Sequence, residues 1–185
     1  MTEIRQTYSA PARILHWTVA AIALTLIGAG FVMTLDGLGR AQQNMLFILH
    51  KNAGILLLLL MIVRLVYRWR TPPPQLPHSV PAWQARLARA THATLYCLLF
   101  LMPVAGYIRV KAGGFPVESL DALGVPALVP RSEALAELAK SIHYFGGLTI
   151  AALVAFHIAA TVYHDVVRED GVLPRMMGAG NHVER

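Results

Sequence analysis

Charged side chains are scarce in this sequence. Only 14% of its 185 residues are Asp, Glu, Lys or Arg, whereas 56% are hydrophobic and the mean hydropathy is +0.51. A water-soluble domain of this length needs more charged surface than such a composition supplies. The sequence therefore predicts an integral membrane protein.

Cysteine is almost absent as well. Cys97 is the only one in the chain, so no disulfide can form within it. No C-x-x-C-H segment is present, which excludes covalent attachment of haem. Cys97 falls inside an apolar run, where we expect a small packing residue.

Four long stretches contain few or no charges. They cover residues 14–35, 41–66, 90–108 and 141–164, and each is close to the roughly 20 residues with which a helix crosses a bilayer. No small-residue cleavage pattern follows the first stretch, so we expect it to stay in the mature protein. The prediction is an all-α membrane protein, with one domain over residues 1–185 folded as a four-helix transmembrane bundle. Its spans are expected at about 14–35, 43–67, 87–110 and 138–166.

Two of the connections are rich in residues that break helices. Five prolines fall within residues 72–82, a density that no helix tolerates, so an extended loop is expected there. Residues 111–130 are rich in Gly and Pro and are expected to fold over the outer membrane face. Pro130, Arg131 and Ser132 then resemble a helix start, which places the beginning of the fourth helix near Ser132.

Acidic residues are fewer than basic ones, and the net charge is +6 with a pI near 9.9. The basic residues do not form a nucleic-acid footprint, so no nucleic-acid partner is expected. They crowd into the connection between the second and third spans, as Arg64, Arg68, Arg70, Arg86 and Arg89. The short first connection has only Arg40 with Asp36. By the positive-inside bias, the second connection and both termini are predicted to be cytoplasmic.

Four of the histidines in the apolar runs are distributed over two depths. His16 and His157 are expected toward the cytoplasmic side, and His50 and His143 toward the outer side. Because His143 and His157 are fourteen residues apart, one helix presents them within roughly 40° of the same face, separated by about 21 Å of rise. Haem iron takes two axial imidazoles, and bundle interiors supply them from separate helices. Two stacked bis-histidine haems would use all four rings.

A path for zinc, iron or protons would also use intramembrane histidines. Such sites normally recruit carboxylates, and every Asp and Glu of this chain lies outside the four runs. The sequence therefore favours haem ligation over transport. The sequence does not define which histidines would share an iron, because depth alone does not select His157 over His164 or His92 as the partner of His16.

Three further residues are candidates for contacts at these sites. Arg64 lies fourteen residues after His50, on roughly the same face at the opposite depth. It is either a functional group with a buried partner or an arginine that extends to the headgroups. His164 lies seven residues after His157, on the same stripe, where it could contact a haem propionate or a quinone headgroup. His92 is open to three interpretations: ligand, quinone contact or packing residue.

Glycines accompany the histidines at helical spacing. Gly28 and Gly30 follow His16 by twelve and fourteen residues, and Gly106 follows His92 by fourteen. Glycine in membrane helices usually permits close helix packing. On the face of a histidine it would also make room for a flat macrocycle.

Seven short patterns occur in order along the chain. They are R-I-L-H-W at 13–17, L-H-K-N-A-G at 49–54, V-R-L-x-x-R at 63–68 before T-P-P-P, H-A-T-L-Y at 92–96, P-V-A-G at 103–106, the spacing of His143, His157 and His164, and R-M-M at 175–177. Through them the sequence resembles the bacterial cytochrome b561 family, which also includes b-type subunits of membrane hydrogenases and dehydrogenases. It is most similar to the small, stand-alone members that act as superoxide:ubiquinone oxidoreductases.

The resemblance implies a multi-pass protein of the bacterial inner membrane with two non-covalent b haems. It places His16 and His157 on the inner haem iron, and His50 and His143 on the outer one. It further implies a membrane oxidoreductase that oxidises superoxide at the periplasmic face and reduces ubiquinone in the membrane. The alternative is a b-type cytochrome subunit that relays electrons between a partner dehydrogenase or hydrogenase and the quinone pool.

On the first interpretation, cations at the outer face attract the superoxide anion. The candidates are Lys51, Arg109 and Lys111. Arg64, His92 and His164 are then candidates for contacts with the propionates or with quinone. The expected partners are membrane lipid, quinone, and superoxide or another small reductant, with a redox partner protein in the relay alternative.

Overall fold

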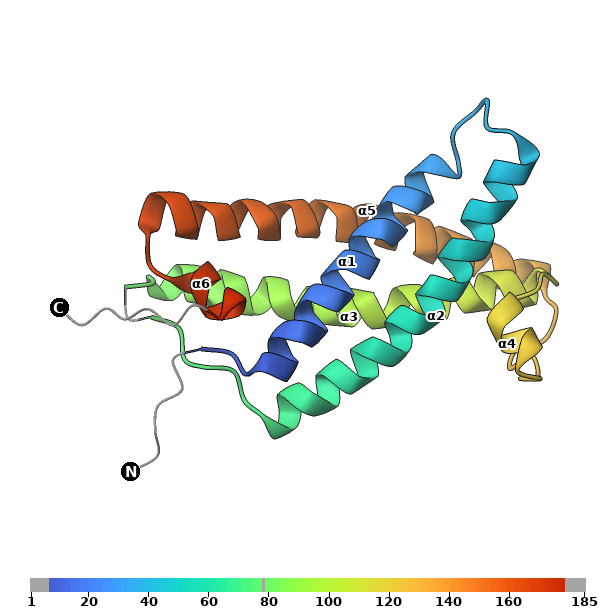
Figure 1. Ribbon diagram of the computed structural model, residues 1–185. Helices are drawn as coiled ribbons and strands as arrows, with labels where there is room; N and C mark the ends of the chain where they lie inside the picture. The colour runs from blue at the N-terminus through green and yellow to red at the C-terminus, as the bar shows by residue number, and fades with distance from the viewer. Residues whose placement is uncertain (1–6, 78, 179–185) are drawn as a thin grey trace.

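The computed structural model describes residues 7–77 and 79–178, so both ends of the predicted domain lie partly outside the described residues. All regular secondary structure in this part of the chain is helical (Figure 1). The four long helices are α1 (Ala10–Val32), α2 (Arg40–Arg70), α3 (Ala82–Ala112) and α5 (Glu133–Val162), and α5 continues through a π-helical turn, η1 (Tyr163–Arg168). The short helices are α4 (Glu118–Ala122) and α6 (Val172–Met177). The predicted all-α fold is confirmed.

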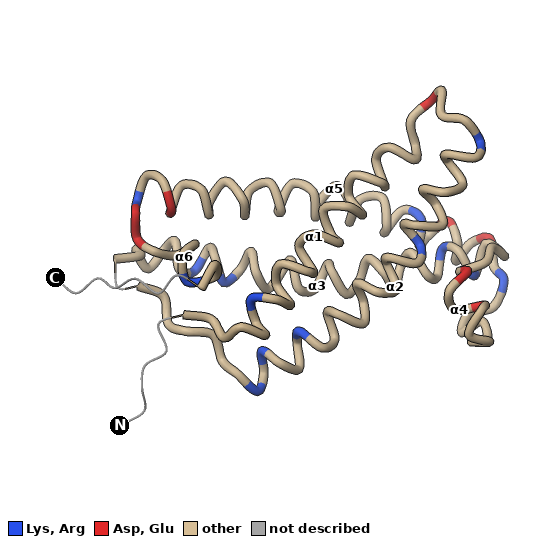
Figure 2. Tube along the Cα trace, viewed as in Figure 1, with Lys and Arg blue, Asp and Glu red and all other residues tan. Residues whose placement is uncertain are grey.

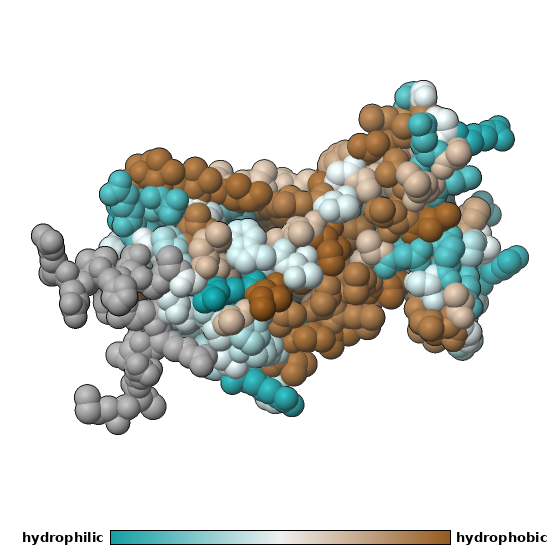
Figure 3. Space-filling model, in the orientation of Figure 1, coloured by the Kyte–Doolittle hydropathy of each residue, from teal (hydrophilic) through white to brown (hydrophobic). Residues whose placement is uncertain are grey.

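The four long helices are apolar enough, and long enough, to cross a membrane. Figure 3 shows hydrophobic residues over the middle of the visible face and hydrophilic residues gathered mostly toward its two ends. Side chains such as Leu24, Leu59 and Phe156 are exposed on the long helices, where a bilayer would place lipid tails. The prediction of four membrane-crossing helices is confirmed.

Each long helix begins before the apolar run that predicts it. For example, α3 begins at Ala82 and α5 at Glu133, because a helix satisfies its own backbone groups whether its side chains face lipid or water. The predicted start near Ser132 is confirmed, since the Ser132 Oγ caps α5 by accepting a hydrogen bond from the Leu135 amide (3.3 Å). Helix ends do not mark the edges of the bilayer, so the predicted span limits stay predictions.

The long helices pack as two pairs. Helix α1 packs along α2 and α3 along α5, and α2 also contacts α3. In Figure 1 the α1–α2 pair crosses the α3–α5 pair obliquely. The Tyr8 amide donates to the Arg175 carbonyl (3.2 Å), so the two described ends of the chain meet. We call this the inner end of the bundle, and the end that carries α4 the outer end.

A cluster of buried side chains lies where α1 faces α2. Val19, Leu26, Leu57 and Met61 form a core cluster, against which Tyr96 of α3 packs. Lipid tails are as apolar as these side chains, so close packing rather than removal from water stabilises the cluster.

Met61 tests this packing, because it is 1% exposed whereas its neighbour Ile62 is 47% exposed. The substitution Met61→Ala opens a cavity and is expected to lower the free energy of unfolding by about 2 kcal/mol. Ile62→Ala exchanges one lipid contact for another and is expected to cost less than about 0.5 kcal/mol. Denaturation of both variants in detergent micelles measures the difference. Equal losses would contradict a core at Met61.

Candidate functional site

Two histidines from different helices meet toward the outer end. The ring centroids of His50 on α2 and His143 on α5 are 5.9 Å apart, with an interplanar angle of 71°. Both rings are partly buried. A metal–imidazole bond is about 2 Å long, so rings at this separation have the spacing for one metal ion between them.

Glycines on the neighbouring helices provide space for these two rings. A Cβ on Gly106 of α3 would lie 3.1 Å from the Cε1 atom of His143, and one on Gly30 of α1 would lie 3.3 Å from Cε1 of His50. The sequence associated these glycines with His92 and His16 instead. The structure shows that each one makes room for a histidine of the outer pair.

Each glycine lies four residues after a backbone carbonyl that faces the same ring. The His143 Nδ1 donates a hydrogen bond to the Met102 carbonyl (3.1 Å), which fixes the ring and leaves Nε2 with its lone pair. The Leu26 carbonyl occupies the corresponding position near His50. The buried His50 Nδ1 makes no hydrogen bond to a described residue. The outer pair therefore fits a haem, because one ring is already oriented for ligation and the other has a nitrogen still to be satisfied.

Three histidines meet toward the inner end. The His157 ring of α5 lies 6.5 Å from that of His16 on α1 and 5.2 Å from that of His92 on α3, measured between centroids. His16 and His157 have a separation close to that of the outer pair. His92 is the nearer of the two rings to His157. The sequence left open whether His157, His164 or His92 is the partner of His16. The structure brings His16, His92 and His157 together.

Arg64 is anchored inside the bundle at this inner site. Its Nη2 donates to the His16 Nδ1 (2.8 Å) and its Nε to the Tyr96 hydroxyl (3.0 Å). The guanidinium also lies 5.4 Å from the centroid of the Tyr96 ring. Of the two interpretations of Arg64, the structure favours the buried functional group.

His164 is engaged separately from the three inner histidines. It lies in the η1 turn, where its Nδ1 bonds the Asp170 carboxylate (2.6 Å). The stripe that joined it to His157 assumed a regular α-helix, whereas a π-helical turn changes the angular position of each residue. The Asp170 side chain is only 2% exposed, and no sequence signal distinguished it from the other acids of the tail.

Two of the three predicted outer cations are paired with carboxylates. Lys51 donates to Glu118 (2.6 Å), and Lys111 pairs with Asp121. Both acids belong to α4. Figure 2 shows acidic and basic residues close together around this helix. Among the described residues, Arg109 forms no ion pair. Of the three candidates, Arg109 therefore keeps its charge least compensated.

Helix α4 is held over the outer end beside His50. Asn52 donates to the Glu118 carboxylate (3.1 Å) and accepts from the Ser119 amide (2.8 Å), while Lys51 also donates to the Pro116 carbonyl (2.8 Å). Burial alone would raise the pKa of the Glu118 carboxyl, but the hydrogen bonds from Lys51, its own amide and Asn52, with the Lys51 charge, hold that pKa below its ordinary value. Sequence reasoning missed Asn52 and Glu118, although a polar pair directly after an intramembrane histidine was a signal.

Comparisons with known proteins extend over nearly the whole chain. Residues 7–179 match the profile of the family described as prokaryotic cytochrome b561. The chain is 28% identical to cytochrome b561 homolog 2 of Escherichia coli (strain K12), over 96% of this chain and 94% of that protein. It is 31% identical to cytochrome b561 homolog 1 of the same strain, over 88% and 92%. It is 26% identical to the probable superoxide oxidase CybB of Yersinia pestis, over 88% and 91%.

The lowered pKa of Glu118 predicts how α4 responds to acid. The contact stabilises α4 above the ordinary value of 4.5 and is lost as the pH falls through the lowered pKa of the folded state. Glu118→Gln removes the ion pair at every pH and is expected to raise amide exchange at Ser119 about fivefold, since a partly exposed pair contributes about 1 kcal/mol. Hydrogen exchange, corrected for its intrinsic pH dependence, measures this. Glu133→Gln, outside α4, is the control, and unchanged Ser119 exchange in Glu118→Gln would contradict the prediction.

Proposed function

This chain belongs to the prokaryotic cytochrome b561 family, and we propose that it is a di-haem member that oxidises superoxide at its outer face and reduces ubiquinone in the membrane. Membrane electron transfer, b-type haem and a multi-pass location in the bacterial inner membrane follow from the family and the four apolar helices. The observation that carries the finer proposal is that α5 contributes one histidine to each of two pairs.

In this proposal His50 and His143 hold the outer haem, and His16 and His157 hold the inner one. A b haem held by such a pair would supply an iron that gains and loses one electron at a time. The Met102 carbonyl keeps the proton of His143 on Nδ1, which leaves Nε2 to the metal. His92, whose ring packs edge to face on that of His157, is a positioning residue for the inner site.

Arg64 would change partners when the inner site is filled. It now donates to the His16 Nδ1, which is possible only while that nitrogen has its lone pair. If His16 held a metal through Nε2, its ring proton would lie on Nδ1, and the guanidinium would need another acceptor. A propionate carboxylate is such an acceptor, and arginine binds carboxylates well. Arg64 is therefore assigned to the propionates of the inner haem.

The overall reaction is balanced with two superoxide anions for each quinone. Each superoxide loses one electron and becomes O₂, and ubiquinone takes up the two electrons and two protons to become ubiquinol. Arg109 lies near enough to the outer pair to act on both rings through its charge, and a cation there raises the rate at which an anion is encountered. One relative's name, probable superoxide oxidase, supports this donor.

The number of haems tests the two-pair assignment. The unaltered protein is expected to carry two b haems, and His143→Ala or His157→Ala to retain one each, because each variant removes one axial ligand of one pair. Haem-to-protein ratios and reduced-minus-oxidised spectra measure this. His164→Ala, whose histidine is bound to Asp170, is expected to keep both haems. Loss of both haems, or of neither, in the two ligand variants would contradict the assignment.

The donor is tested at Arg109. We expect Arg109→Gln to slow reduction of the haems by superoxide about threefold to tenfold at low ionic strength, with a smaller difference at high salt because screening removes the attraction. Stopped-flow absorbance measures the rate. Arg40→Gln removes an exposed arginine of the first connection and serves as the control. If superoxide does not reduce the haems of the unaltered protein, the result supports the alternative of a relay subunit.

A further inference from the structure

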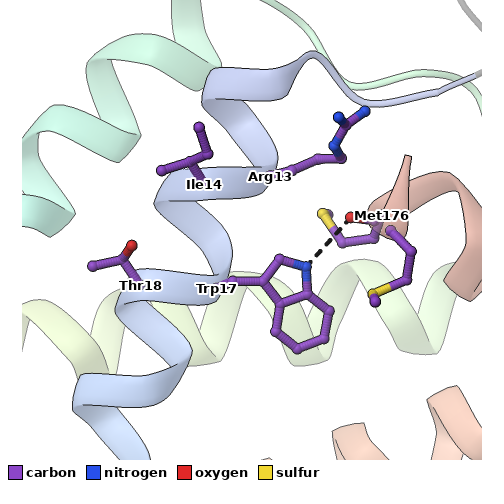
Figure 4. A pocket seen from close by; sticks show the side chains of 6 residues that line it. Arg13, Ile14, Trp17, Thr18 and Met176 are labelled. Carbon is purple, nitrogen blue, oxygen red and sulfur yellow. Dashed lines mark hydrogen bonds between the residues drawn. The ribbon is translucent and has the colours of Figure 1, made fainter. Parts of the chain in front are cut away.

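A groove of about 410 Å³ opens at the inner end, where α6 lies against α1 (Figure 4). Its lining consists of Arg13, Ile14, Trp17 and Thr18 of α1 with Met176 and Met177 of α6. The four α1 residues share one face of the helix, since residues 13 and 17, and likewise 14 and 18, are about one helical turn apart. The groove therefore has an apolar wall on each side and polar groups at two levels.

Two hydrogen bonds join α6 to α1 and to the segment before it. The Trp17 indole N–H donates to the Met176 carbonyl (3.3 Å), as Figure 4 shows. The Tyr8 amide donates to the Arg175 carbonyl (3.2 Å). The wall opposite α1 is thus a built part of the structure.

The groove lies one aromatic contact from the inner histidine pair. The Trp17 ring packs edge to face against the His16 ring, with centroids 5.2 Å apart. A redox-active molecule in the groove would lie against Trp17 and hence close to His16. None of the residues that line the groove has a role in the haem assignments above.

Polar groups of the groove suit a neutral molecule with two acceptors. Arg13 donates once to the Tyr8 carbonyl (3.1 Å) and has further N–H groups to offer, while the Thr18 hydroxyl lies about 7.5 Å farther along the helix. Gly178 makes the position of Arg13 possible, because a Cβ there would lie 2.6 Å from the guanidinium carbon.

We propose that this groove binds the ubiquinone headgroup, an inference that rests on the proposed function. The quinone ring lies against Trp17, Ile14 and Met177, one carbonyl accepts from Arg13, and the other accepts from Thr18. The isoprenoid tail leaves through the lipid-facing side, where Ile14 is 66% exposed.

Charge distinguishes this groove from a second cavity on the other side of the inner site. That cavity, of about 270 Å³, is lined by Leu65, Arg68, Arg89, His92, Ala93 and Tyr96. Two arginines and a histidine suit an anionic group such as a carboxylate or a phosphate. The groove has a single cation, Arg13, among its lining residues, which suits a neutral quinone better than an anion.

An azidoquinone that crosslinks on illumination tests the inference in the haem-loaded protein. We expect it to label peptides of α1 and α6 in the unaltered protein. Ile14→Trp fills the groove from an exposed position and is expected to lower this labelling at least tenfold. Ala93→Trp fills the second cavity instead and is expected to leave the labelling unchanged.

A kinetic measurement tests the same groove. Arg13→Gln is expected to raise, about tenfold, the KM for a short-chain ubiquinol that reduces the haems, with haem content unchanged. Arg86→Gln removes an exposed arginine of α3 at the same end and is the matched control.

Four results would overturn the inference. The first is labelling that survives Ile14→Trp, and the second is labelling and KM that change with Ala93→Trp instead. A third is loss of copurifying phospholipid from Ile14→Trp with unchanged labelling, which would make the groove a lipid site. Haems of the unaltered protein that ubiquinol fails to reduce would overturn the proposed function together with the groove.

Discussion

Every proposed role in this protein depends on one constraint, that an imidazole within a membrane bundle needs a partner on another helix. Helix α5 places a histidine ring opposite a ring of another helix twice, His143 opposite His50 and His157 opposite His16. Water is not present in the hydrocarbon region to solvate these polar rings. The bundle therefore has to supply the partners itself, and doing so fixes which helices face α5 at each depth.

Glycine residues allow the outer histidine rings to lie close to the neighbouring helices. The outer rings approach the backbone of α1 and α3 only because Gly30 and Gly106 have no side chain there. At the inner end the approach is made by long side chains instead, with Arg64 reaching across from α2 to His16 and Tyr96. The outer site is therefore shaped by backbone and the inner site by groups that can exchange partners. This difference suits an inner site where anionic groups must be accommodated.

The two ends of the bundle are closed by different short helices. At the outer end, Glu118 and Asp121 of α4 form ion pairs with Lys51 and Lys111. These pairs compensate two positive charges that the sequence predicted to be available to an anion. At the inner end α6 lies on α1 through an indole hydrogen bond and leaves a groove beside it. Polar closure at one end and apolar closure at the other would suit the water-soluble donor and the lipid-soluble acceptor proposed above.

The sequence by itself determined the four membrane helices, the start of α5 at Ser132 and the end of the bundle toward which each paired histidine lies, because these follow from local composition and helical periodicity. It also indicated that α5 would serve two sites, since fourteen residues return to one face. Only the tertiary structure decided which rings meet, that Arg64 contacts His16 and that His164 pairs with Asp170. Those contacts join segments far apart in the chain or lie beyond a π-helical turn, where periodicity no longer gives direction.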